Sequence, residues 1–207
     1  MKSLCKQKFN PTDCRREWTE FSNLLSSKMV LDEAKDILPF FKKRLHLSML
    51  ISSYFPDIRS ADVIAHEYPI YGDFKADLII GDSSAKQYLL VEFEDGRPDS
   101  IFKKKKGKTT PEWSGRFERA FSQIVDWIWK LEDMRSTANF SNVFGNRTAK
   151  FHGLIIIGKD MKLSAEEESR LNWRTDRVFV DSHKVSCVSF DTLCSDLDFW
   201  LNKYYNQ

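Results

Sequence analysis

Residues 74–80 (FKADLII) and 87–93 (QYLLVEF) decide the fold, because both read as strands and only a short segment separates them. Aliphatic and aromatic residues dominate both stretches, which is typical of the paired strands of a hairpin. The intervening residues are polar, and 83–86 are suited to a four-residue loop. The length of that loop fixes the register of the two strands.

Acidic side chains gather on one face of this hairpin. The register places Asp77 opposite Glu92 and Lys75 opposite Glu94. Because side chains alternate along a strand, these four share one face. The other face is apolar and carries Leu89, Val91 and Phe93.

Three acids on one face repel one another unless a cation lies among them. Carboxylate oxygens are ligands that suit Mg²⁺ or Mn²⁺. The pattern therefore favours a divalent metal site built from Asp77, Glu92 and Glu94. It leaves a plainer interpretation open, in which the acids solvate the sheet and Lys75 forms a surface ion pair with Glu94.

Further strands are predicted on both sides of the hairpin. Residues 63–71 are strand-like, and 151–157 are almost wholly apolar, as expected of a strand buried on both faces. Residues 185–188 form another strand candidate.

Helix signals lie between and around these strands. Thr12 is expected to cap a first helix, and a second helical stretch covers about 31–54 with an interruption near Pro39. The long apolar stripe of residues 113–131 follows Thr110-Pro111-Glu112, which predicts a helix start at this point. Two later helices are predicted, one from the Ser164 and Glu167 capping box and one over residues 192–205.

This order predicts an α/β protein with one central sheet flanked by helices. We expect residues 1–56 to form an N-terminal helical segment packed on the core. Residues 57–207 are expected to form the α/β core with a strand-helix tail.

The composition excludes several classes of protein. The net charge of +2 gives no global field for nucleic acid, so any basic surface has to be local. Residues 1–9 lack the apolar run of a secretory signal, and no stretch has the length of a membrane span. The four cysteines lack CxxC spacing, which favours reduced thiols in a cytoplasmic protein over a zinc site from Cys187, Cys194 and His183.

The central part of the chain resembles the Shedu family, an anti-phage defence family within the PD-(D/E)xK nuclease superfamily. The resemblance rests on residues 72–80 (GDFKADLII), 90–94 (LVEFE) and 120–127 (AFSQIVDW), with weaker support from 153–158 and 189–193. It implies a restriction-endonuclease-like mixed sheet, a homo-oligomer, and metal-dependent hydrolysis of DNA with Mg²⁺ or Mn²⁺.

The resemblance also implies roles for individual residues. Asp77 and Glu92 match the metal-binding acids of the superfamily, and Glu67 on the preceding strand matches a further acid. Gln123, with Trp127 in place of a tyrosine, resembles a helix signature that approaches the metal or the DNA backbone. Each also fits a plain structural role, as a strand-surface acid for Glu67 and a helix-edge amide for Gln123.

One position departs from the pattern, because Glu94 stands where the superfamily has a catalytic lysine. Glu94 could act as a metal ligand or general base, or Lys75 could supply the cation from the neighbouring strand. A third possibility is a module that binds DNA without cutting it, and a fourth is an assembly domain.

A lysine-rich loop follows the acids in sequence. Exposed lysines give salt-dependent, sequence-independent contact with phosphates, although such a loop is as often merely solvated. The predicted DNA contacts are Lys103, Lys104, Lys105, Lys106 and Lys108.

Overall fold

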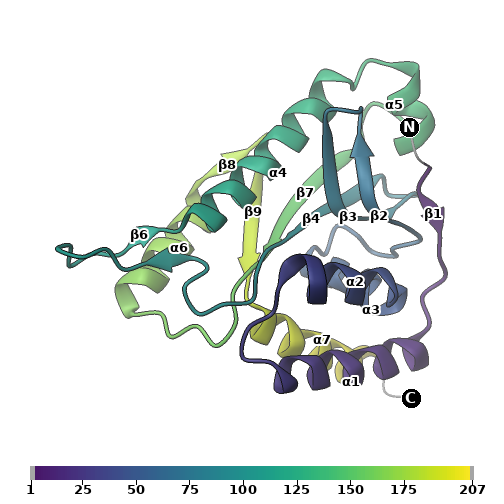
Figure 1. The fold of residues 1–207 in the computed structure, drawn as a ribbon. Coiled ribbons are helices and arrows are strands. Elements are labelled where there is room, and N and C mark those ends of the chain that lie inside the picture. The colour runs from purple at the N-terminus through teal and green to yellow at the C-terminus, as the bar shows by residue number, and fades with distance from the viewer. Residues whose placement is uncertain (1–2, 206–207) are drawn as a thin grey trace.

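The computed structural model describes residues 3–205 and confirms the α/β class. Its main sheet has seven strands in the order β1-β2-β3-β4-β7-β9-β8, and helices cover both faces (Figure 1). Strands β2 to β4 are antiparallel, whereas β4, β7 and β9 run parallel, so the sheet is mixed. The strands of this sheet are β1 (Cys5–Lys6), β2 (Val63–Ile70), β3 (Phe74–Asp82), β4 (Gln87–Phe93), β7 (Lys150–Ile156), β8 (Phe179–Val180) and β9 (His183–Val188).

The β3–β4 hairpin has the register that its loop length predicts. Asp82 pairs with Gln87 and Leu78 with Val91. The Asp82 carboxylate accepts hydrogen bonds from the backbone N–H groups of Ser84 and Ala85, which stabilises the turn. The predicted apolar face is also confirmed, since Leu89, Val91 and Phe93 all lie in one buried cluster.

Helical elements precede and follow the strands. The N-terminal elements are α1 (Pro11–Ser27), the π-helical η1 (Glu33–Ile37), α2 (Leu38–Lys42), α3 (Leu45–Leu50) and the 3₁₀ helix η2 (Ile51–Tyr54). The later helices are α4 (Gly115–Asp133), α5 (Ala138–Phe144), α6 (Ala165–Arg177) and α7 (Phe190–Tyr205). The capping box of Ser164 and Glu167 at α6 is formed as predicted.

Two predicted helix starts are wrong. Asn10 caps α1 in place of Thr12, and its side chain accepts from the N–H groups of Thr12 and Asp13. Helix α4 begins at Gly115, capped by Ser114, and not at Pro111. The local signal at Pro111 is overridden by pairing, because residues 112–113 form β6 (Glu112–Trp113) against β5 (Phe102–Lys103).

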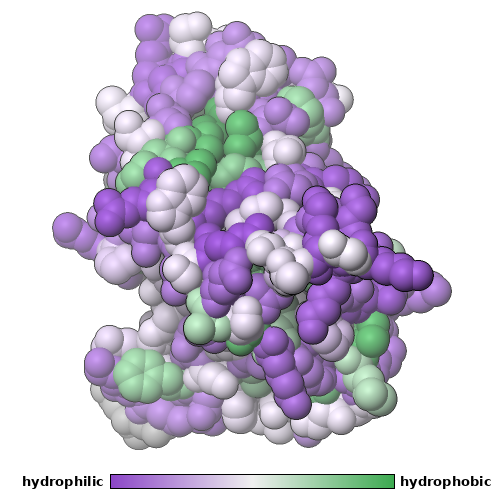
Figure 2. Space-filling view, turned by 90° about the vertical axis from the view of Figure 1, so that its left-hand side faces the viewer, coloured by the Kyte–Doolittle hydropathy of each residue, from purple (hydrophilic) through white to green (hydrophobic). Residues whose placement is uncertain are grey.

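The β5–β6 hairpin projects from the body as an arm that carries the lysine-rich loop (Figure 1). Viewed from that side, the middle of the molecule is covered by hydrophilic side chains, and an apolar patch lies above them (Figure 2). The loop lysines 103–106 and 108 are all exposed. Their accessibility fits the predicted contact with phosphates and does not test it.

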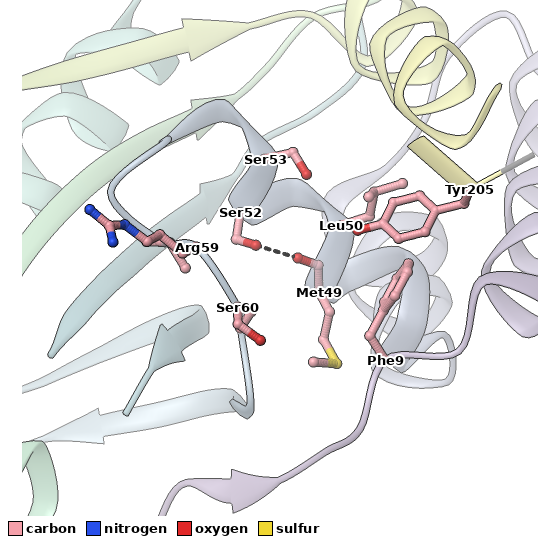
Figure 3. A pocket seen from close by; sticks show the side chains of 10 residues that line it. Phe9, Met49, Leu50, Ser52, Ser53, Arg59, Ser60 and Tyr205 are labelled. Atoms are coloured by element: carbon pink, nitrogen blue, oxygen red, sulfur yellow. Dashed lines mark hydrogen bonds between the residues drawn. The ribbon is translucent and has the colours of Figure 1, made fainter. Parts of the chain in front are cut away.

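A separate small cavity lies beside α3 and η2, between these helices and the two ends of the described chain (Figure 3). Its volume is about 180 Å³, and its lining includes Phe9, Met49, Arg59 and Tyr205. Ser52 Oγ at its edge donates to the Met49 carbonyl over 2.7 Å. None of the acids of the hairpin lines this cavity.

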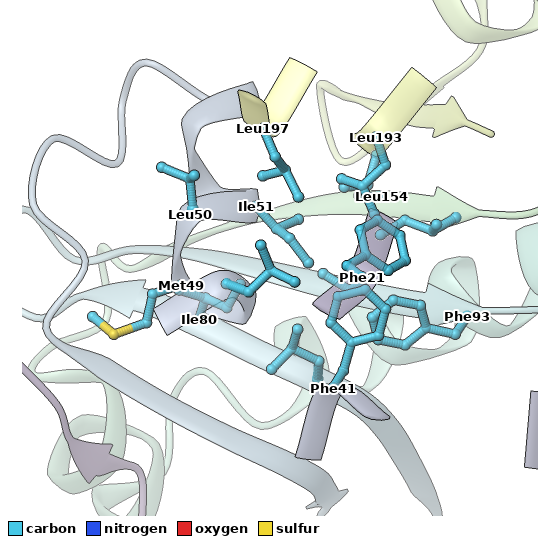
Figure 4. Packing of buried hydrophobic residues seen from close by; sticks show 14 of the residues in the cluster. Phe21, Phe41, Met49, Leu50, Ile51, Ile80, Phe93, Leu154, Leu193 and Leu197 are labelled. Atoms are coloured by element: carbon cyan, nitrogen blue, oxygen red, sulfur yellow. The ribbon is translucent and has the colours of Figure 1, made fainter. Parts of the chain in front are cut away.

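Two apolar cores lie on opposite faces of the sheet. One cluster joins α1, α2, α3 and α7 to the side chains of β3, β4 and β7, with Phe41 stacked on Phe93 at 4.7 Å between ring centroids (Figure 4). The other cluster packs α4 and α5 on the opposite face, and Gly153 of β7 lets Ile124 of α4 approach closely. The boundary predicted at residue 56 falls between η2 and β2, and the first cluster extends across it.

Within residues 3–205, no helix has both the length and the apolar character that crossing a membrane requires.

The Phe41→Ala substitution tests the first core. Phe41 is 1% exposed and contacts the rings of Phe21, Phe40 and Phe93, so truncation leaves a cavity between α2 and the sheet. We expect a loss of about 3–5 kcal/mol in the free energy of unfolding, measured by urea denaturation. Phe199→Ala is the control, because Phe199 is 54% exposed and should change stability by less than about 0.5 kcal/mol. Equal losses in the two variants would contradict this packing.

Candidate acidic centre

The β3–β4 ladder ends where the acids begin. Leu78 and Val91 form the last pair, and the Asp77 carboxylate then accepts the Phe93 backbone N–H over 2.9 Å. Beyond this point β4 continues along β7, since the Glu94 N–H donates to the Ile156 carbonyl. A side chain therefore replaces a ladder bond between β3 and β4, and polar groups gather at this break in the pairing.

Asp77 and Glu92 form a buried carboxyl pair. They are 8% and 4% exposed and lie within hydrogen-bonding reach of each other. Burial raises the pKa of Glu92 to about 10, and the negative charge of Asp77 adds to this. Burial also raises the pKa of Asp77, whereas the Phe93 N–H and Glu92 favour its ionised form. Glu92 is thus the partner that keeps a proton.

One oxygen of this pair is unsatisfied. Glu92 Oε2 is buried and has no hydrogen-bond partner among the residues that the structure describes. A buried polar atom without a partner is costly and points to a missing ligand or proton. It is the observation that best fits a cation at this position.

Two further carboxyls complete the acidic centre, which we define as Glu33, Asp77, Glu92 and Glu94. Glu94 is 4% exposed, and burial raises its pKa. Glu33, from η1, has its pKa raised to about 7 by burial and then by the charges of Asp77, Glu94 and Asp95. The helical segment thus supplies a carboxyl to the hairpin.

Asp95 holds the surrounding elements together. Its carboxylate accepts the Glu33 N–H at the start of η1 and contacts Arg97 and Arg116 at 3.1 and 3.2 Å. Its carbonyl accepts from Ser100 Oγ and from the Gly158 N–H after β7. Asp95 therefore fixes η1, β4, β7 and α4 around the acids.

Helix α4 presents positive charge to the acidic centre. Arg119 Nη2 lies 3.7 Å from Glu94 Oε1, and Arg116 lies one turn earlier against Asp95. Gln123, half-buried, follows at helical spacing on the same face. This face of α4 therefore carries two arginines that contact Glu94 and Asp95, and Gln123 lies one turn further along the same face.

Lys75 does not face Glu94 as the extended register predicts. Its side chain is 58% exposed and pairs with Glu67 at 3.2 Å, and Glu94 pairs with Arg119 instead. The cause is the end of the β3–β4 ladder, beyond which the two strands no longer face each other. Lys75 still lowers the pKa of Asp77 through its charge.

Glu67 lies in a distorted part of β2. Its φ of 45° interrupts the β2–β3 pairing between His66–Leu78 and Tyr68–Ala76, so it sits beside Asp77 in the sheet. Its half-exposed carboxylate is held by Lys42 and Lys75, which lower its pKa.

The lysine-rich loop is only partly paired. Lys105 and Lys108 contact Glu112 at the base of the arm, and this lowers the Glu112 pKa. The charges of Lys103, Lys104 and Lys106 extend into solvent, since all three residues are exposed.

The donor set decides whether a metal fits. Across residues 3–205, the structure contains no group of three or more His, Cys, Asp or Glu side chains in metal-holding geometry. Cys187, Cys194 and His183 accordingly form no such group either. Magnesium, however, is commonly held by one or two carboxylates together with waters and substrate phosphates. Asp77 and Glu92, with the free Oε2, fit a site of that smaller kind.

Sequence reasoning missed Glu33, Asp95, Arg116 and Arg119. The spacing of Arg116 and Arg119 was a usable signal, because both share one helical face with Gln123. Nothing in the local sequence marks Glu33, which enters the centre only through tertiary packing.

Stability of the metal-free protein should fall as pH rises. The folded-state pKa values of Glu33 and Glu92 are raised to about 7 and about 10, so the folded state binds more protons than the unfolded state above pH 4.5. The stability linked to these two protons is fully present below pH 4.5 and is lost as pH rises through the folded-state pKa values. We expect the free energy of unfolding to decrease from pH 5 to pH 9 in urea titrations with a chelator, with the larger part of the decrease from the more deeply buried Glu92.

Glu92→Gln should flatten this dependence, because the amide carries no titrating proton. Glu67→Gln is the matched control, since the pKa of Glu67 is lowered and its removal should leave the slope unchanged. A wild-type stability that is constant or rises over this range would contradict the buried-proton interpretation.

Comparison with known proteins completes the description of the site. No curated protein matches the chain. The family model described as "Shedu protein SduA, C-terminal" matches residues 31–194, which include Glu33, both strands of the hairpin and α4 to α6. The chain therefore belongs to the Shedu family, and this membership indicates a role in defence against phages.

Proposed function

We propose that this protein is a metal-dependent DNA endonuclease of phage defence that hydrolyses phosphodiester bonds at the acidic centre. The observation that carries the proposal is the buried Asp77–Glu92 pair with its unpartnered Oε2. Family membership supports the defence role, and a homo-oligomer in the cytoplasm stays a prediction.

Asp77 and Glu92 are the residues that would hold Mg²⁺ or Mn²⁺. When bound, the metal would orient the phosphodiester, make water more acidic and offset the charge that develops on the phosphorane. Loss of the Glu92 proton would accompany binding, because a cation favours the ionised form of both carboxyls.

Glu33 is suited to accept the proton of the attacking water. Burial raises its pKa, as do the charges of the nearby Asp77 and Glu94, and a bound cation would favour its ionised, proton-accepting form. Glu94 has a raised pKa and contacts Arg119, so we assign it the positioning of that arginine. Gln123 lies on the same face of α4, and we assign it a hydrogen bond to the DNA backbone.

Arg119 takes the role that the resemblance assigns to the missing lysine. Its side chain is 67% exposed, so the guanidinium can turn from Glu94 to a phosphate in the site. Lys75 is the runner-up cation, since its charge reaches Asp77. The exposed lysines of the arm would contact phosphates along the duplex.

A second candidate function is DNA binding without cleavage. The observation that favours it is Glu94, because an acid at the lysine position leaves the strand without its own cation. Binding of DNA with no product in Mg²⁺ or Mn²⁺, under conditions in which a control nuclease cuts, would support this alternative.

Asp77→Asn tests the metal site. We expect wild-type protein to cleave plasmid DNA in Mn²⁺ and the variant to lose at least about 100-fold in rate, because a key oxygen ligand is weakened. Mn²⁺ should also raise the melting temperature of the wild type and not of the variant. Asp73→Asn is the control, since Asp73 is half-exposed on the same hairpin and pairs with Lys130. Cleavage by Asp77→Asn at the wild-type rate would rule out this centre.

Arg119→Ala tests the cation on α4. Removal of one donor that stabilises developing charge typically costs about 100-fold to 1,000-fold in kcat, and we expect a loss of that size with little change in KM. Arg119→Lys should recover part of the rate. Arg16→Ala is the control, since the Arg16 side chain is 66% exposed on α1 and pairs with Asp13. If Lys75→Ala lowers kcat and Arg119→Ala does not, Lys75 is the cation.

A further inference from the structure

An aromatic pocket with two arginines lies between α4, α6 and the base of the arm. Its volume is about 410 Å³. Its lining contains no carboxylate and consists of Trp113, Phe121, Arg170, Trp173, Arg174 and Val178. None of these residues belongs to the acidic centre.

The inner wall of this pocket is a rigid stack of rings and guanidinium groups. Trp113 stacks between Phe102 and Phe117, with centroid separations of 4.5 and 4.8 Å. The Arg174 guanidinium lies 4.9 Å from the Trp113 ring, and Glu118 holds it through two hydrogen bonds of 2.6 and 2.9 Å. The wall is therefore fixed before any ligand binds.

The outer wall differs, because Trp173 is 63% exposed. A large aromatic ring left in solvent beside a preformed aromatic pocket offers a face on which a planar ligand can stack. Arg170, Arg174 and Arg177 lie on the same helix at intervals of about one turn, and Arg174 is paired with Glu118.

The pocket and the lysine-rich loop form one continuous surface. Trp113 belongs to β6 of the arm, and Arg170 Nη1 donates to the Pro111 carbonyl at the base of the arm over 2.6 Å. Cations suited to a phosphate backbone thus adjoin aromatic rings suited to bases at the base of the arm. This combination is typical of sites for single-stranded nucleic acid.

We propose that the pocket binds a nucleobase of single-stranded DNA by stacking on Trp173, while the loop lysines contact the adjoining phosphates. The choice of DNA rests on the proposed function. The exposed lysines beside the pocket favour this occupant over an apolar protein partner or a second copy of the chain, because their charges would otherwise have to be desolvated.

Alanine substitution of Trp173 tests the inference in a binding assay. The full chain is titrated, in a chelator that prevents cleavage, against fluorescent oligothymidylate and against an abasic strand of equal length. We expect Trp173→Ala to weaken oligothymidylate binding by about 5-fold to 100-fold and to leave abasic binding unchanged, since only the bases stack. Trp173→Phe should restore most of the affinity. Trp129→Ala is the matched control, because Trp129 is 59% exposed on α4 and does not line the pocket.

Three results would overturn the inference. The first is equal affinity of wild type and Trp173→Ala for oligothymidylate. The second is an equal loss for both strands, which would show that Trp173 acts on the backbone contacts or the fold. The third is a wild-type dimer in light scattering that Trp173→Ala dissociates, because the pocket would then be an interface between copies.

Base binding at the pocket and cleavage at the acidic centre can be tested separately. Base-dependent binding at Trp173 without cleavage of any DNA in Mn²⁺ would sustain the pocket and reject the nuclease. Metal-dependent cleavage with unchanged binding in Trp173→Ala would do the reverse.

Discussion

The bond from the Phe93 N–H to the Asp77 carboxylate is the interaction on which the acidic centre depends. It ends the β3–β4 ladder at Asp77, one position before Leu78 in the sequence, and leaves β4 to continue along β7. A continuous ladder would keep backbone groups paired across this point, with no room for side chains between the strands. Burial raises the pKa of both Asp77 and Glu92, whereas the Phe93 N–H favours the ionised form of Asp77.

Such a centre is unfavourable by itself, and the rest of the fold offsets its cost. Burial of several carboxyls raises their pKa values and lowers stability at neutral pH. The large cores on both faces of the sheet provide the stabilisation that permits this. Asp95 then anchors η1, β7 and α4 around the acids through separate bonds. The elements around the acidic centre therefore hold its carboxyls in place.

The sequence predicted what local pattern controls. The hairpin register follows from loop length and alternation. The buried strand β7 follows from its apolar run, and the start of α6 follows from its capping box. The start of α4 could not be predicted locally, because the signal at Pro111 lost to pairing of β6 with β5. Glu33 and Arg119 were missed for a related reason, since each reaches the acids from a helix distant in sequence. Lys75 was misplaced because the register was extended past the end of the ladder.

Helix α4 brings a positive charge to the strand acid Glu94. Arg119 on the helix contacts Glu94, at the position where the resemblance implies a lysine. On the side of the same helix that faces α6, Phe117 and Phe121 pack against Arg174. One rigid element therefore carries both the cation of the acidic centre and a wall of the aromatic pocket. A shift of α4 would change both sites together. A ligand bound at the arm and α6 would then also affect the acidic centre through this helix.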